Sequence, residues 1–144
     1  MEFEYKNILI AVDGSKTSEK ALDKSIQIAK RNDANLIIAY VVDTKTFSAI
    51  EPYDSNIYEH SQIAAHEMLD KYENVINTAG LLNSKRIVKL GSPKVVITRE
   101  IIPEENIDLT IVGATGLGAV ERILMGSVSE NIVRHAKSDV LVVR

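Results

Sequence analysis

Apolar segments that alternate with helix-forming segments constrain the fold of this chain more than any other feature of its sequence. The apolar segments lie at 8–12, 36–42, 85–90, 109–112 and 140–143. Uninterrupted apolar runs such as Ile8–Val12 are typical of strands that are buried on both faces of a parallel sheet. Strict alternation of strand and helix favours right-handed crossovers that cover both faces. We therefore predict an α/β fold, with a single doubly wound domain over residues 1–144 and a five-stranded parallel sheet.

The segments between the predicted strands have the periodicity and end signals of helices. Helices are predicted at about 16–31, at 57–79, for about ten residues from Pro93, and at 128–136. Ser15 is the predicted N-cap of the first helix and Gly80 the glycine that ends the second. The residues expected to face the core are Ala21, Leu22, Ser25, Ile28 and Ala29 in the first helix, and Ile63, Ala64, Met68, Leu69, Tyr72 and Ile76 in the second. Pro103 is expected after the third helix has ended.

The predicted strand order is 3-2-1-4-5, which reverses beside strand 1. In open parallel sheets, ligands bind beyond the carboxyl ends of the strands at the point of reversal. Asp13 ends strand 1 and Gly113 ends strand 4. These two turns should therefore meet at one site. The longest connection, 43–56, is polar and is a candidate flap.

Four glycines, at positions 113, 116, 118 and 126, lie between the fourth strand and the last helix. Glycine permits positive φ and lets a ligand approach backbone N–H groups, and a helix N-terminus adds free N–H donors with a partial positive charge. The stretch lacks the lysine of a Walker A loop. Two interpretations remain open: a cradle for an anion such as phosphate, or a turn before a helix with the capping box Ser127-x-x-Glu130.

With these features, the chain resembles the universal stress protein family over essentially its whole length. The resemblance rests on Ile-Leu-Ile-Ala-Val-Asp-Gly-Ser at 8–15, Gly-Ser-Pro at 91–93, and the block at 108–143. It implies an adenine-nucleotide alpha hydrolase-like (Rossmann-like) fold.

Nucleotide-binding members of that family carry the pattern G-x2-G-x9-G-[ST], which Gly113, Gly116, Gly126 and Ser127 match. The resemblance therefore implies the ATP-binding branch, with ATP and Mg²⁺ or Mn²⁺ as cofactors. The chain departs from the usual family pattern in two places. Ala-Thr stands at 114–115 where many members have Ser-His or Thr-His, and Ser-Asp stands at 138–139 where many have Cys-Pro.

The resemblance assigns roles to residues at the crevice. The predicted nucleotide-binding residues are Ala11, Val12, Asp13, Val41, Val112, Gly113, Thr115, Gly116, Gly126, Ser127, Val128 and Ser129. Backbone groups at the glycines, at Ser127 and in the following turn should hold ribose and phosphate oxygens. Val41 should offer its backbone to the adenine edge, with Ala11 and Val12 nearby, although Val41 can also be an ordinary core residue.

Side chains at the crevice have two interpretations each. Asp13 can accept from a ribose hydroxyl or hold a water of the metal ion, or it can cap the next helix as an Asx turn. Thr115 can donate to phosphate or face water. Arg122 can neutralise a γ-phosphate, but a solvated loop arginine is favoured. No residue set for a direct metal site or for catalysis stands out, and His60, His66 and His135 are expected on the surface.

Composition excludes several classes of protein and favours others. The net charge of −3 argues against nucleic acid or an anionic membrane as the main partner. The absence of cysteine excludes disulfides, thiolate zinc sites and a cysteine nucleophile. The charged N-terminus is unlike a signal peptide, and no apolar run approaches the length of a membrane span. We therefore expect a cytoplasmic protein.

Three functional hypotheses follow. The first is an ATP-binding regulatory switch in stress response, with little hydrolysis and an unknown protein partner. The second is a slow ATPase or adenylyl-transferring enzyme, and the third is a dimeric interaction module with a structural nucleotide. A homodimer is expected because the last strand, Val140–Val143, is apolar on both faces and lies at a sheet edge. The alternative is a monomer whose edge is shielded by the last helix, Asp139 and Arg144.

Overall fold

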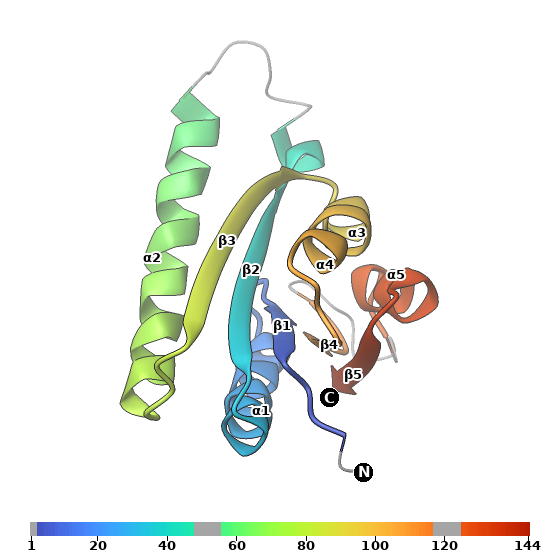
Figure 1. Cartoon of the computed structure of the whole chain (residues 1–144). Helices are drawn as coiled ribbons and strands as arrows, with labels where there is room; N and C mark the ends of the chain where they lie inside the picture. Colours follow the sequence, from blue (N-terminus) through green and yellow to red (C-terminus); the bar gives the residue numbers. More distant parts are fainter. Residues whose placement is uncertain (1–2, 48–55, 117–124) are drawn as a thin grey trace.

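A parallel sheet in the order β3-β2-β1-β4-β5 forms the centre of the molecule (Figure 1). The computed structural model describes residues 3–47, 56–116 and 125–144. The strands of this part are β1 (Asn7–Ala11), β2 (Asn35–Asp43), β3 (Ser84–Gly91), β4 (Leu109–Gly113) and β5 (Asp139–Val143). The predicted α/β architecture and strand order are confirmed. The reversal lies beside β1, which pairs with both β2 and β4.

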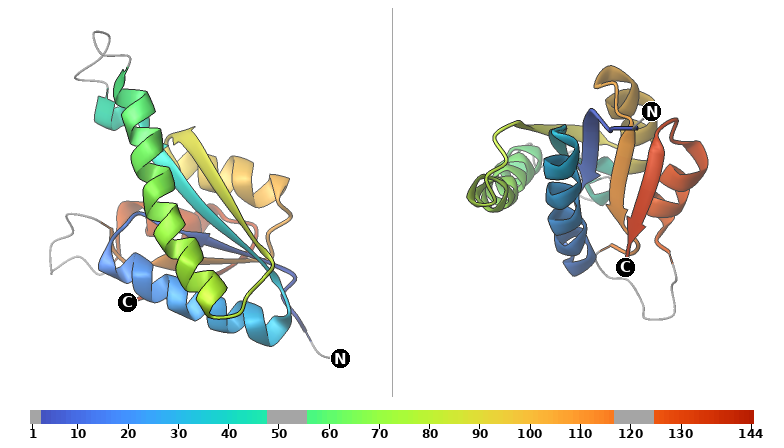
Figure 2. Two further views of the ribbon diagram at one scale, coloured as in Figure 1. Left: turned by 90° about the vertical axis from the view of Figure 1, so that its left-hand side faces the viewer. Right: turned by 60° about the horizontal axis from the view of Figure 1, so that its bottom comes forward.

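Helices cover both faces of the sheet (Figures 1 and 2). One face carries α1 (Lys16–Asn32) and α2 (Asn56–Thr78). The other carries α5 (Ser127–His135) and a continuous helical segment made of α3 (Pro93–Val95), the π-helix η2 (Val96–Ile101) and α4 (Ile102–Glu104). A short 3₁₀ helix, η1 (Thr44–Phe47), follows β2. A large apolar core lies on each face of the sheet, and a smaller cluster around Val42 and Ala65 lies between β2 and α2.

Local signals in the sequence set the ends of the two long helices. The Ser15 side chain caps α1 by accepting a hydrogen bond from the N–H of Ser18 at 3.2 Å, as predicted. Asp33 ends α1 in the left-handed region, with φ of 50°. Gly80 follows α2 with φ of 87°, a conformation that glycine adopts without a steric penalty. The caps predicted for these two helices, Ser15 and Gly80, are confirmed.

The buried face of α2 matches the predicted one in its second half, at Leu69, Tyr72 and Ile76, and differs in its first half. Ala65, Leu69, Tyr72 and Ile76 are buried, and this 4-3-4 spacing defines a single stripe along the helix. Ile63 is 51% exposed and Ala64 is also exposed, so their predicted core positions are wrong. Ile63 precedes Ala65 by two residues, which turns it about 200° away from the stripe.

Pro103 lies within α4, and its predicted position beyond the helix is therefore wrong. The reason is the preceding π-helix, in which the N–H of Ile102 bonds to the carbonyl of Ile97, five residues earlier. This wider turn leaves Pro103 in the first turn of the α-helical register that follows, where a missing N–H is tolerated.

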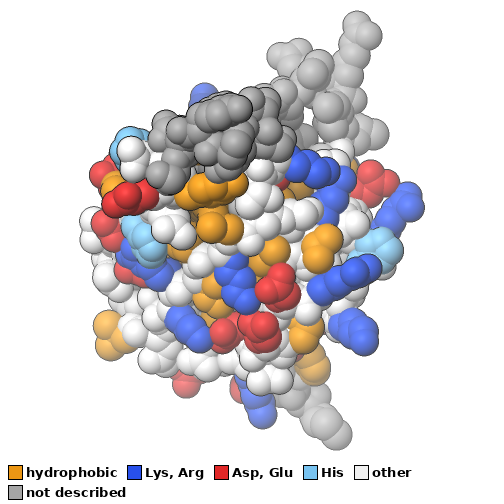
Figure 3. Space-filling model, turned by 90° about the horizontal axis from the view of Figure 1, so that it is seen from above, with side chains coloured by type: hydrophobic (Ala, Val, Ile, Leu, Met, Phe, Trp, Pro, Cys, Tyr) orange, Lys and Arg blue, Asp and Glu red, His pale blue; other side chains and the backbone are white. Residues whose placement is uncertain are grey.

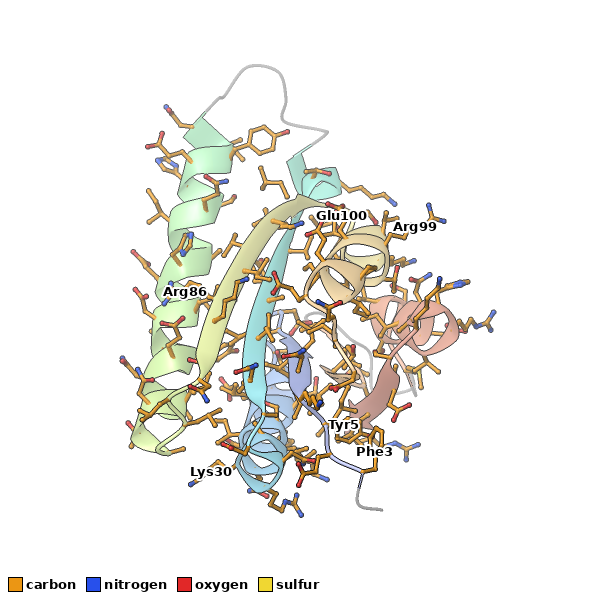
Figure 4. The ribbon with its side chains drawn as sticks, in the orientation of Figure 1. Phe3, Tyr5, Lys30, Arg86, Arg99 and Glu100 are labelled. Atoms are coloured by element: carbon orange, nitrogen blue, oxygen red, sulfur yellow. The ribbon has the colours of Figure 1, made fainter. Side chains whose placement is uncertain are left out.

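Arg86 links β3 to α2 through hydrogen bonds to side chains of the helix (Figure 4). Its Nε and one terminal nitrogen bond to the two carboxylate oxygens of Glu73 at 2.8 and 2.7 Å. The same terminal nitrogen bonds to Asp70 at 2.7 Å. The hydrogen bonds from Arg86 hold the pKa of Glu73 below its ordinary value of 4.5. A bidentate pair of this kind also fixes the relative position of the two elements.

The Glu73–Arg86 pair predicts a pH-dependent contribution to stability. Because the pKa of Glu73 is lowered in the folded state, its contribution is complete above the ordinary value of 4.5 and is lost as the pH falls through the folded value. We expect Glu73→Gln to lower the free energy of unfolding by about 1 kcal/mol at neutral pH and to have little effect near pH 3. Urea unfolding at both pH values measures this difference.

Glu67→Gln is a matched control for this prediction. Glu67 lies on the same helix, is exposed, and has no ion pair within the described part of the chain. Its substitution removes the same charge and should change stability little at either pH. Equal losses for the two variants at neutral pH would show that the pair with Arg86 contributes nothing specific.

Candidate functional site

A cavity of about 740 Å³ lies beyond the carboxyl ends of β1, β2 and β4, where the strand order reverses. Its volume is within the range of about 300–1,000 Å³ that is usual for small-molecule sites. The cavity is lined by every residue predicted for the site, namely Ala11, Val12, Asp13, Val41, Val112, Gly113, Thr115, Gly116, Gly126, Ser127, Val128 and Ser129. The structure therefore brings together three turns that are far apart in the sequence.

Further lining residues were missed by the sequence analysis. They are Ser15, Ser18, Ala39, Tyr40, Val42, Asp43, Ser61, Ala64, Pro93, Ile97 and Ile132. The alternating direction of side chains along β2 was a usable signal for its last residues, because side chains on both faces of a strand can reach a cavity at its end. The contributions of α2 and η2 had no such signal, since they depend on how these helices cross the sheet.

Free backbone donors lie at the start of α5. The first intrahelical bond joins the N–H of Glu130 to the carbonyl of Gly126 at 2.9 Å. The N–H groups of Ser127, Val128 and Ser129 precede that bond and have no acceptor within the helix. These three donors, together with the positive end of the helix dipole, favour an anion at this end of the cavity.

The predicted capping box at the start of α5 is wrong. The N-cap is Gly126, which has no side chain, and Ser127 is the first helical residue. Ser129 takes the structural role instead. Its buried hydroxyl lies 2.9 Å from the carbonyl of Ala114 and 3.0 Å from that of Gly126, which joins the two glycine turns. The exposed Ser127 hydroxyl has no partner within the described residues.

The three motif glycines are not required by backbone conformation. None of Gly113, Gly116 and Gly126 has positive φ, so the expectation that this stretch uses left-handed glycines is wrong for them. A Cβ on Gly113 would lie 2.7 Å from the Thr17 hydroxyl oxygen and 3.0 Å from the Thr17 carbonyl carbon. A Cβ on Gly116 would lie 2.5 Å from Oδ2 of Asp13.

Gly126 differs from the other two glycines. A Cβ there would make ordinary contacts, the nearest being 3.5 Å from the carbonyl oxygen of Ala114. Packing thus explains why positions 113 and 116 exclude a side chain, but it does not explain position 126. The bare backbone at Gly126 leaves the space beside the α5 donors open.

Asp13 forms the Asx turn predicted for it, and its role toward a ligand stays a prediction. Its Oδ1 accepts the N–H of Ser15 at 2.9 Å, which is the Asx turn expected before α1. Its Oδ2 lies directly beside Gly116 in the cavity lining and accepts no hydrogen bond from the described residues. The Asp13 N–H donates to the Ser18 hydroxyl at 3.1 Å. The carboxylate is therefore held in place by α1 and still presents one oxygen.

Thr17 connects α1 to the turn after β4. Its hydroxyl donates to the carbonyl of Thr115. It also lies 3.2 Å from the Ser15 hydroxyl. The Thr115 side chain lines the cavity and has no hydrogen-bond partner within the described part of the chain. The interpretation of Thr115 as a donor to a ligand remains open.

Part of the cavity lining is apolar. The apolar side chains are those of Ala39, Val41, Ile97, Val112, Val128 and Ile132. The N–H of Val12 donates to the carbonyl of Ala39 at 2.9 Å, and β1 pairing stops at Ala11. Because backbone direction repeats every second residue, the N–H and C=O of Val41 point past the end of β1. An unpaired donor and acceptor therefore border an apolar slot that suits a planar ring.

The electrostatic character of the cavity comes from Asp13 and Asp43. Among the described residues that line it there is no Lys, Arg or His. Burial raises the pKa of the Tyr40 phenol, and the charges of both aspartates raise it further. Tyr40 therefore stays neutral well above physiological pH. The described residues contain no cluster of three or more His, Asp or Glu side chains that could hold a metal ion.

The remaining candidates are placed away from the cavity or cannot be placed. His60, His66 and His135 are exposed, as expected, and His66 lies beside Arg86 with 3.2 Å between Nδ1 and a guanidinium nitrogen. Arg122 lies outside the described residues, as do 48–55 of the proposed flap.

The surface at the end of the molecule where β2 and β3 finish has mixed charge, with Lys and Arg interspersed with Asp and Glu (Figure 3). No described helix is long and apolar enough to span a membrane.

Comparison with known proteins places this architecture in one family. The model of the universal stress protein family matches residues 4–144. A relative from Staphylococcus haemolyticus, named as a universal stress protein, is 49% identical over 140 residues, which is 97% of this chain and 85% of the relative. The structure of the universal stress protein UspA from Lactobacillus plantarum superposes with a TM-score of 0.90 and 31% identity, covering 99% of this chain and all of that one.

A second similar structure is that of a universal stress protein in complex with cAMP. It superposes with a TM-score of 0.75 and 28% identity, covering 99% of this chain and 98% of that one. The resemblance inferred from the sequence is thus confirmed at the level of the family. The chain belongs to the universal stress protein family.

Proposed function

We propose that this protein binds an adenine nucleotide, ATP, in the cavity at the sheet reversal and acts as a nucleotide-dependent regulatory switch in the cytoplasmic stress response. One observation carries the proposal: the cavity combines an apolar slot at Val41 with three free backbone donors at the start of α5. A nucleotide needs both an apolar surface for its base and donors for its phosphates.

The nucleotide is proposed to lie with its base between β2 and η2. Its adenine edge pairs with the N–H and C=O of Val41, and the base packs against Val112 and Ile97. The phosphates lie at Ser127–Ser129, where Gly126 leaves space for them. A relative at 28% identity forms a complex with cAMP, which supports an adenine nucleotide as the ligand class.

The charge of the phosphates requires compensation. The described lining supplies helix N–H groups but no cationic side chain. Mg²⁺ or Mn²⁺ on the phosphates would neutralise them, and the free Oδ2 of Asp13 fits one ligand or a water of such an ion. Asp13 is the carboxylate proposed for the phosphate end, and one carboxylate there suits an ion that arrives with the nucleotide rather than a resident metal.

A switch with little turnover is favoured over an enzyme by the same lining. Phosphoryl transfer relies on positioned cations and on a group that orients the attacking water. Among the described residues, the cavity offers only carboxylates and hydroxyls. A slow ATPase, an adenylyl-transferring enzyme, and a dimeric module with a structural nucleotide are the alternatives that the experiments below distinguish.

Gly126→Val tests the phosphate position. The branched side chain would fill the space beside the α5 donors, while the backbone at φ −71° and ψ 162° accepts valine without strain. We expect ATP affinity to fall at least tenfold, or about 1.4 kcal/mol, with little change in melting temperature. Calorimetric titration of wild type and variant with Mg²⁺–ATP measures it.

Gly113→Ala is the matched contrast. Its Cβ would meet the Thr17 backbone and hydroxyl, so this substitution should lower the melting temperature of the protein. If Gly126→Val binds ATP as well as wild type does, the phosphates do not lie at the start of α5 and the proposed site is wrong.

Hydrolysis of ATP by the purified protein is expected to be much slower than about 1 s⁻¹, the lower end for ordinary enzymes. The reason is the lack of a cationic side chain in the described lining. Phosphate release with Mg²⁺–ATP in excess measures the rate. A rate near or above that value would favour the enzyme alternative, whereas activity only with an added cell extract would support a partner-dependent switch.

A homodimer through β5 is the proposed assembly. The N–H of Asp139 bonds to Asp108 and the carbonyl of Val143 accepts from Ala114, so the backbone groups of these alternate residues face β4. The backbone groups of Val140 and Val142 therefore face the open edge. The opposite edge strand, β3, carries Lys and Arg side chains of the kind that discourage pairing.

Val142→Pro tests this assembly without touching the β4–β5 ladder. Proline removes one donor from the open edge, so the variant should elute as a 15.9 kDa monomer where the wild type elutes at twice that mass. Light scattering at micromolar concentration measures both. Leu141→Pro is the control, because it removes a donor that faces β4 and should destabilise the fold. A monomeric wild type would refute the dimer.

A further inference from the structure

Asp43 is a carboxylate at the base end of the cavity that the proposed binding mode does not use. It is the last residue of β2 and lies two residues beyond Val41. Because backbone and side-chain directions repeat every second residue, Asp43 follows Val41 on the same face of the strand and along the same open edge. It is therefore the first charged group beyond the backbone edge at which the base is proposed to pair.

One oxygen of this carboxylate is held and the other is free. Oδ1 accepts the N–H of Lys45 at 3.0 Å, which forms an Asx turn into η1. Oδ2 has no hydrogen-bond or ion-pair partner among residues 3–47, 56–116 and 125–144. The carboxylate thus has a fixed place at the cavity and one acceptor that a ligand can use.

The described residues that line the cavity near Asp43 include a second polar side chain, the phenol of Tyr40. The Tyr40 side chain approaches the cavity from the opposite face of β2, and its hydroxyl has no partner within the described residues. Burial and the nearby Asp13 and Asp43 charges raise the pKa of Tyr40, so it stays protonated and neutral. The cavity lining contains no cationic side chain in the part of the chain that the structure describes.

These groups give the base end an excess of hydrogen-bond acceptors. An exocyclic amino group that projects past Val41 meets an oxygen that can accept its hydrogen. A carbonyl in the same place meets a carboxylate that cannot donate, so two acceptors face each other and no hydrogen bond forms. Sites that hydrogen-bond one polar group of a ligand discriminate against an analogue that lacks this group.

We propose that Asp43 selects purine nucleotides with a 6-amino group over those with a 6-oxo group. This inference rests on the proposed nucleotide function of the cavity, and it adds a specificity-determining residue to that function. The backbone of Val41 supplies one donor and one acceptor and fixes the base edge. The Asp43 carboxylate then decides which substituent is accepted at the end of that edge.

The experiment compares ATP with inosine triphosphate, which differs from ATP in the substituent at C6 and the associated proton at N1. Calorimetric titrations with Mg²⁺ are run on wild type, Asp43→Asn and Asp13→Asn. Wild type should bind ATP about tenfold or more tightly than inosine triphosphate. In Asp43→Asn the ratio should fall by about fivefold or more, mainly because inosine triphosphate binds more tightly.

The asparagine is a conservative probe of the mechanism. Its amide oxygen can still accept the Lys45 N–H, and its amino group can donate to a 6-carbonyl. Asp13→Asn removes the same charge at the sugar and phosphate end, so it should shift both affinities together and leave their ratio unchanged. Asp43→Ser is a second variant for the case in which asparagine perturbs the fold, and it should reduce the ratio in the same direction.

The outcomes separate this inference from the function on which it rests. Equal wild-type affinities for the two nucleotides would overturn it, as would an unchanged ratio in Asp43→Asn and Asp43→Ser, while ATP binding itself stood. An equal fall of the ratio in Asp13→Asn would assign the preference to net charge and would also overturn it. Failure of wild type to bind either nucleotide would instead refute the proposed function.

Discussion

The cavity depends on the close contact between the first turn of α1 and the end of β4. The backbone of Gly113 lies directly against Thr17, and a single added Cβ would reach 2.7 Å from its hydroxyl oxygen. That hydroxyl donates to Thr115 and so fixes the turn that follows β4. The helix after β1 and the turn after β4 are thereby joined at the reversal of strand order, where neither strand continues. The open space beyond β1 is the result.

The three glycines of the G-x2-G-x9-G-[ST] motif are explained by two different physical causes. Protein atoms lie too close to Gly113 and Gly116 for a side chain to fit. These atoms are the Thr17 backbone and hydroxyl at Gly113 and an Asp13 carboxylate oxygen at Gly116. At Gly126 the packing would accept a side chain, so the bare backbone there concerns the space in front of α5. Spacing in a sequence identifies such positions, but it does not separate structural glycines from glycines that leave room for a ligand.

The two ends of the cavity follow from ordinary properties of strands and helices. A strand that extends beyond the end of its neighbour has unpaired backbone donors and acceptors, and β2 extends in this way past the last residue of β1, Ala11. A helix that begins without a side-chain cap leaves its first N–H groups free, as α5 does after Gly126. Asp43 and Asp13 lie at the ends of adjacent strands and give this space its negative charge. The proposed function and the proposed base preference use these unpaired groups together with the apolar side chains between them.

The sequence by itself determined the order of strands and helices along the chain and the parallel sheet that they form. These depend on local hydrophobic period, caps and chain connectivity, which a single sequence displays. The part of the cavity lining that was predicted came from the strand ends together with the resemblance to the family. Tertiary structure alone decided which face of α2 is buried, how a π-helix accommodates Pro103, and that Ser129 rather than Ser127 secures the start of α5. It also brought Asp43 and Tyr40 into the cavity. Each of these depends on the crossing of helices over a twisted sheet, which local sequence does not encode.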